Sequence, residues 1–66
     1  MGDHTIIDDL IALRKERDIT QVNLSRKSGI AQPVIARIEA KRAQPTLTTL
    51  QRLADALDAV ITLRAK

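Results

Sequence analysis

Hydrophobic residues recur at helical spacing in the first part of the chain. Residues 6–17 predict a helix, because its apolar positions fall three and four residues apart and basic residues near its end suit the negative pole of the helix dipole. The residues that define this pattern are Ile6, Ile7, Leu10, Ile11, Leu13 and Arg14.

Two short helical segments follow, joined by a tight turn. Thr20 is a good N-cap and predicts a two-turn helix over residues 21–27. Gly29 supplies the positive φ that the turn needs, and a third helix is predicted over residues 32–39, with Pro33 tolerated in its first turn. The residues predicted to face inward are Leu24 and Ser25 in the second helix and Ile35 and Ile38 in the third.

A fourth helix is predicted after Pro45 and Thr46, ending near residue 57. Its buried face is expected to consist of Leu47, Leu50, Leu53, Ala54 and Leu57.

The last residues change character, because β-branched side chains alternate there with other types. Residues 60–65 predict a short strand. A single strand in a helical chain exposes an open edge, so we expect it to pair with a second copy across a two-fold axis. The alternative is a frayed terminal segment. The residues expected to dimerise are Val60, Ile61, Thr62, Leu63 and Arg64.

A chain of 66 residues predicts one domain, 1–66, composed of a tail (1–5), a helical part (6–57) and the dimerisation strand (60–65). A domain this small buries only about 60% of its unfolded surface. It has no cysteine and a single histidine, His4, so we expect no disulfide, no metal site and no cofactor. A second subunit is the remaining way to extend the core.

The composition also limits the partners. No apolar run approaches the roughly 18 residues of a membrane span, so we expect a soluble cytoplasmic protein without a membrane partner. Residues 31–52 are basic and residues 1–10 are acidic, which indicates either a polyanion on one face or a solvated charge run. The chain has no aromatic residue for stacking unpaired bases, so a nucleic-acid partner would be a duplex.

Two short helices joined by a turn containing glycine form a helix-turn-helix unit, whose second helix can enter the major groove of DNA. The outward positions of the predicted third helix are Gln32, Ala36 and Arg37, which leave its face unusually bare. Small residues allow close approach to base edges, and Gln and Arg can hydrogen-bond to them.

Residues 10–57 resemble the Cro and lambda-repressor type of DNA-binding domain, also called the xenobiotic-response-element family. The resemblance rests on Ile19-Thr20-Gln21, on "SGI" at 28–30, on "IARIE" at 35–39 and on Pro45 before "TLTTLQRLADAL". It implies an all-α, compact four-helix fold of the lambda-repressor-like type, to which the C-terminal strand would be added.

The resemblance also implies site residues. Those expected to contact bases are Gln32, Pro33, Ala36 and Arg37, with Gln32 suited to adenine, Ala36 to a thymine methyl group and Arg37 to guanine. Those expected to contact phosphates or support the reading helix are Gln21, Val34, Lys41, Arg42, Gln44 and Thr46. Arg14 and Glu39 match a buried ion pair.

Each of these residues also has a plainer interpretation. Arg37, Lys41 and Arg42 could be solvated surface charges, and Val34 could pack locally. Arg52 is interpreted as a solubility residue on the outside of the fourth helix.

Several positions depart from the family pattern. Asp18, Lys41 and Asp58 stand where glycine is usual, at sites that tend toward left-handed φ, and Lys disfavours that conformation by roughly 1 kcal/mol. Ala31 is a poor N-cap, and Val22 is apolar where the family usually carries charge.

We therefore predict a homodimeric, sequence-specific repressor that binds an inverted repeat in duplex DNA of a bacterial nucleoid. The small size and the β-tail resemble antitoxins of the HigA or HipB kind, which would add a toxin protein as partner. The alternatives are a phage or metabolic mini-repressor and a protein-interaction module that does not bind DNA. We do not expect an enzyme, because the chain lacks a second histidine, a cysteine and a glycine-rich phosphate loop.

Overall fold

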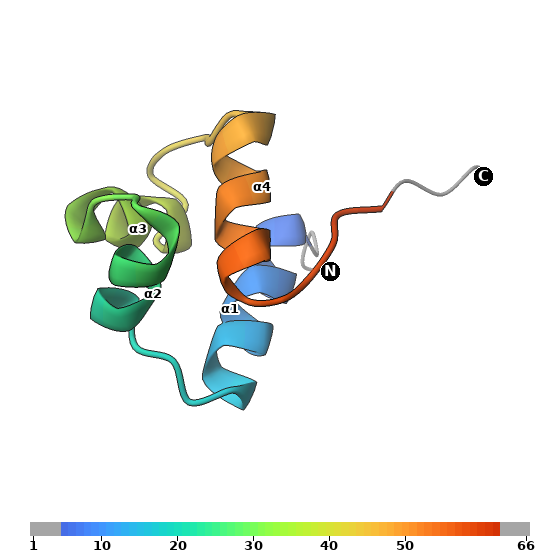
Figure 1. The fold of residues 1–66 in the computed structure, drawn as a ribbon. Coiled ribbons are helices and arrows are strands. Elements are labelled where there is room, and N and C mark those ends of the chain that lie inside the picture. The colour runs from blue at the N-terminus through green and yellow to red at the C-terminus, as the bar shows by residue number, and fades with distance from the viewer. Residues whose placement is uncertain (1–4, 63–66) are drawn as a thin grey trace.

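The computed structural model describes residues 5–62, which form four helices (Figure 1). The helices are α1 (Ile6–Glu16), α2 (Gln21–Ser28), α3 (Gln32–Glu39) and α4 (Leu47–Ala56). Within this range no helix is both long and apolar enough to cross a membrane.

Three of the four helices begin at a threonine. The hydroxyl oxygens of Thr5, Thr20 and Thr46 accept hydrogen bonds from backbone N–H groups three residues later, which satisfies donors that the helix itself leaves free. Helix α3 begins instead after Ala31, whose side chain cannot cap it, in agreement with the sequence.

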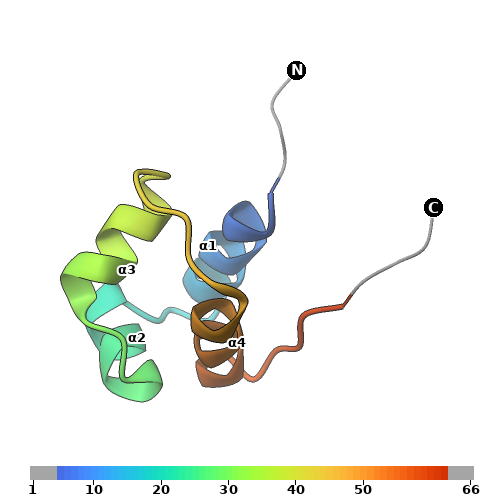
Figure 2. The same ribbon diagram turned by 90° about the horizontal axis from the view of Figure 1, so that it is seen from above.

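The core lies where the helices meet. Helices α2 and α3 lie side by side, with α4 packed against α2 and α1 against α3 (Figures 1 and 2). The buried hydrophobic residues are Leu24, Ile35, Ile38, Leu53, Ala54 and Leu57. The prediction that Leu47 is buried is wrong, because 62% of it is exposed. Leu47 is the first residue of α4, whereas the buried residues of this helix, Leu53 and Ala54, lie in its second half.

Three helix ends share one backbone geometry without glycine. Asp18, Lys41 and Asp58 have φ values of 55°, 61° and 53°, in the left-handed region expected from the resemblance. At each of them two backbone N–H groups donate back to carbonyls of the preceding helix. After α4, for example, the Asp58 N–H donates to the Asp55 carbonyl and the Ala59 N–H donates to the Ala54 carbonyl. This is the Schellman arrangement, in which glycine is usual.

The predicted C-terminal strand is not found in the part of the chain that the structure describes. Ala59 still donates to the Ala54 carbonyl and packs against the core, but residues 60–62 lead away from the end of α4 and belong to neither a helix nor a strand (Figures 1 and 2). A strand needs a neighbouring strand to form a ladder, and residues 5–62 of the single chain provide none. Leu63 and Arg64 of the predicted strand lie outside the described residues.

Candidate nucleic-acid interface

Helix α3 has one buried side and one accessible side. Ile35 and Ile38 are buried in the core, whereas the residues predicted to contact bases remain accessible. Of these, Pro33 and Arg37 are exposed, and Gln32 and Ala36 are half-buried. The accessible side therefore offers one amide and one guanidinium among small side chains.

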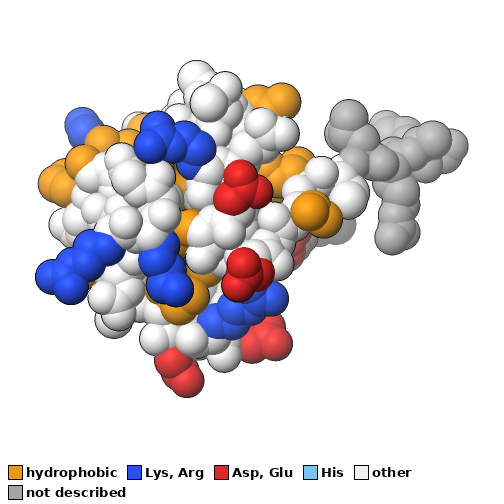
Figure 3. Space-filling view, viewed as in Figure 1, with side chains coloured by type: hydrophobic (Ala, Val, Ile, Leu, Met, Phe, Trp, Pro, Cys, Tyr) orange, Lys and Arg blue, Asp and Glu red, His pale blue; other side chains and the backbone are white. Residues whose placement is uncertain are grey.

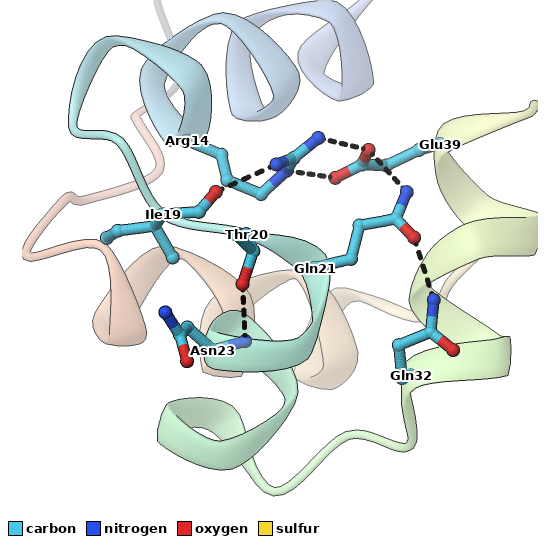
Figure 4. Close-up of polar contacts among 7 residues, drawn as sticks. All are labelled: Arg14, Ile19, Thr20, Gln21, Asn23, Gln32 and Glu39. Carbon is cyan, nitrogen blue, oxygen red and sulfur yellow. Dashed lines mark hydrogen bonds and ion pairs between the residues drawn. The ribbon is translucent and has the colours of Figure 1, made fainter.

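A chain of hydrogen bonds leads from the interior to the first residue of α3 (Figure 4). Arg14 donates to both Glu39 carboxylate oxygens, at 2.7 and 2.8 Å. The Gln21 amide then donates to Glu39 Oε1 at 3.0 Å, and Gln32 Nε2 donates to Gln21 Oε1 at 2.9 Å. Helices α1, α2 and α3 thus each contribute to the placement of Gln32.

The carboxylate at the base of this chain fixes the direction of both amides. An ionised carboxylate only accepts hydrogen bonds, so Gln21 must turn its NH2 group toward Glu39 and its carbonyl toward Gln32. Gln32 must then use one N–H on Gln21, which leaves its carbonyl oxygen and its second N–H for an outside partner. Adenine presents the complementary N6–H donor and N7 acceptor in the major groove.

The ion pair expected from the resemblance, Arg14 with Glu39, is present and nearly enclosed, with side chains only 11% and 13% exposed. Arg14 also donates to the Ile19 carbonyl at 2.8 Å, so the residue before the N-cap of α2 is tied to the same group. Burial works against the Glu39 charge, but the hydrogen bonds from Arg14 and Gln21 outweigh it and lower the pKa of Glu39 below its usual value.

The residues predicted to contact phosphates differ in whether their polar groups are already engaged within the protein. Arg42 and Gln44 are exposed, whereas the hydroxyl of Thr46 is engaged in capping α4. Lys41 is exposed, but its ammonium group lies 2.6 Å from Asp8 Oδ1 at the start of α1. The hydrogen bond from Lys41, together with that from the Thr5 N–H, lowers the pKa of Asp8 to about 2.

The two valines flagged by the sequence have different environments. Val34 is half-buried and packs against the core, which favours the local-packing interpretation. Val22 lies on α2 and is 49% exposed.

Sequence reasoning missed two roles. Asp8 completes a capping box with Thr5 and pairs with Lys41; the Thr-x-x-Asp spacing could have revealed the cap, but nothing local reveals the lysine. Arg52 of α4 covers the turn between α2 and α3. A Cβ atom on Gly29, where φ is +75°, would come within 2.7 Å of the Arg52 Nη2 atom.

Charge is unevenly distributed on the face shown in Figure 3. Lys and Arg side chains lie mostly over α2 and α3, whereas Asp and Glu side chains gather over α4 and α1. The part of this face that lies over the two helices of the helix-turn-helix unit is therefore the more basic part, which suits a polyanionic partner.

Comparison with known proteins gives consistent matches. The helix-turn-helix family model matches residues 10–60. Antitoxin HigA1 of Mycobacterium tuberculosis is 43% identical over 58 residues, which cover 88% of this chain and 39% of the antitoxin. The immunity repressor protein of Bacillus phage phi105 is 42% identical over 53 residues, which cover 80% of this chain and 37% of the repressor.

The chain thus spans less than two fifths of the length of these two relatives. A solved structure titled MDT Protein superimposes with a TM-score of 0.82 at 25% identity, covering 98% of this chain and 96% of that one. The fold of this small chain therefore recurs nearly in full in another protein.

Proposed function

Since the chain belongs to the helix-turn-helix family, we propose that residues 1–66 act as one domain that binds duplex DNA at a specific sequence and represses transcription. The observation that carries this proposal is the hydrogen-bond chain that ends at Gln32. It orients an amide on the accessible side of α3, five residues before the exposed Arg37. A helix that only stabilised the fold would not need an accessible glutamine amide held in a fixed orientation.

Selection from a random duplex library at about 150 mM salt tests this function. We expect the wild-type chain to enrich one sequence, and Arg37→Ala to lose the preference at one base pair, where a bidentate contact discriminates by about 1–3 kcal/mol. Arg26→Ala removes an exposed arginine from α2, outside the predicted contacts, and serves as the matched control. If the wild-type chain enriched nothing, or if both variants behaved alike, the proposal would be wrong.

We further propose that two copies bind an inverted repeat, with their α3 helices in successive major grooves about 34 Å apart. Two features support a dimer. Val60 is 83% exposed, and a hollow of about 190 Å³ lies between α1, α4 and the start of the tail. Its apolar lining includes Ile6, Leu10, Leu13, Ala59 and Ile61. A second copy that paired with residues 60–65 would cover this surface.

The names of the relatives favour a role as the antitoxin of a toxin–antitoxin pair in the bacterial cytoplasm, with repression of a phage or other operon as the second candidate. Affinity purification of the tagged chain from its native host separates these roles. An antitoxin should retain the product of a neighbouring gene in stoichiometric amount, and its absence would favour the stand-alone repressor.

A further inference from the structure

Asp8 and Lys41 form an ion pair at the edge of the proposed DNA-binding surface. Lys41 follows α3, in the loop that leads to α4, and Asp8 lies in the first turn of α1. The Lys41 Nζ–Asp8 Oδ1 distance is 2.6 Å, and the two side chains are 50% and 30% exposed. The pair is thus open to solvent and to a competing anion.

The Asp8 carboxylate is held in place independently of the lysine. Its Oδ2 atom accepts hydrogen bonds from the Thr5 N–H at 2.9 Å and from the Thr5 hydroxyl at 3.3 Å, as part of the capping box of α1. Lys41 is placed by the left-handed helix end at its own position. Both charges are therefore positioned for each other before any DNA arrives.

We propose that Asp8 competes with a DNA phosphate for Lys41 and thereby lowers the affinity of the protein for every duplex. This inference rests on the proposed DNA binding and adds a residue that sets its strength. Arg42, the next residue, is exposed and has no ion pair among residues 5–62. It can therefore bind a phosphate without first breaking an ion pair within the protein. Lys41 must exchange one anionic partner for another.

The exchange has a measurable signature. A cation that binds a phosphate releases condensed counterions, and each such contact steepens the plot of log K against log salt by about 0.9. With Asp8 in place, Lys41 contributes little to this slope, because its charge is already compensated. Removing the Asp8 charge frees one cation.

The test uses Asp8→Asn, whose Oδ1 atom can still cap α1. We expect duplex affinity to rise on the order of fivefold at 150 mM salt, equally for preferred and unrelated sequences, and the salt slope to steepen by about 0.9. Asp55→Asn, which removes an equal charge from α4, is the matched control and should change affinity less than twofold.

A double variant separates competition for Lys41 from general repulsion between Asp8 and DNA. In a Lys41→Gln background, Asp8→Asn should change affinity less than twofold, because no ammonium group remains to be freed. A full increase in that background, or no increase in the wild-type background, would overturn the inference while leaving DNA binding intact. If the wild-type chain bound no duplex under any salt condition, the proposed function itself would fail.

Discussion

At the scale of single residues, the most unusual feature is the use of non-glycine residues at left-handed helix ends. Asp18, Lys41 and Asp58 occupy the position after three helices at which glycine has no steric penalty. Aspartate tolerates this region better than lysine does. The chain therefore stores backbone strain at three points, and one of them, Lys41, has an ion pair that offsets it.

The cost of the left-handed φ can be measured by substituting Asp58, because this residue is exposed at the end of α4. Asp58→Gly should raise the free energy of unfolding by about 0.5–1 kcal/mol, whereas Asp58→Ala, which removes the same carboxylate, should not. Urea denaturation of both variants isolates the backbone effect, since the charge change cancels. Equal unfolding free energies for the two variants would show that φ at this position costs nothing.

Residue by residue, the sequence predicted part of the candidate site. The accessibility of Arg37 and the left-handed φ values followed from helical spacing and from the resemblance. The partner of Lys41 did not, because Asp8 lies on a distant helix and only tertiary packing brings the two charges together. The capping of α1 by Thr5 was visible in the sequence but missed.

At the scale of elements, the helices were predictable because each signal was local. Thr20 and Thr46 mark the starts of α2 and α4, and the predicted bounds of all four helices agree with the structure to within about a residue. Burial was less predictable. Leu47 continues the apolar spacing of α4 but lies beyond its neighbours, so position along the helix, not periodicity, decides its exposure. The strand predicted in the tail is not found among residues 5–62, because a strand forms only beside another strand and this part of the chain offers none.

The ion pair between Arg14 of α1 and Glu39 of α3 should make stability depend on pH. The pKa of Glu39 is lowered in the folded protein, so its stabilising contribution is present above its ordinary value of 4.5 and is lost as the pH falls below it. We expect Glu39→Gln to lower the free energy of unfolding by about 2 kcal/mol at pH 7, because Arg14 loses its charged partner.

The difference in unfolding free energy between wild type and Glu39→Gln should narrow steadily as the pH falls below 4.5. Urea denaturation at several pH values measures it, and Asp8, which also titrates in acid, is common to both proteins and cancels. A constant difference across this range would mean that Glu39 contributes through packing alone.

At the scale of the whole molecule, the two proposed contact surfaces lie on opposite sides. Helix α3 and the more basic surface lie on one side, and the tail leaves the bundle on the other (Figures 1 and 3). Two chains joined through their tails would therefore hold their α3 helices apart, as two separated major grooves require. Among residues 5–62 the core has six buried hydrophobic residues, and apolar surface such as Val60 remains exposed, which the proposed second copy would cover.

This arrangement predicts that the tail controls both assembly and operator affinity. Deleting residues 60–66 should convert a dimer to a monomer in sedimentation equilibrium and should lower operator affinity at least a hundredfold, because the second half-site is no longer held at high effective concentration. Val60→Asp should weaken self-association in the same way, whereas Val22→Asp, which places a charge at an exposed valine on α2, should leave it unchanged. A truncated chain that sedimented and bound DNA like the full chain would place the dimer contact on the helices themselves. The hollow between α1 and α4 would then be the first surface to mutate.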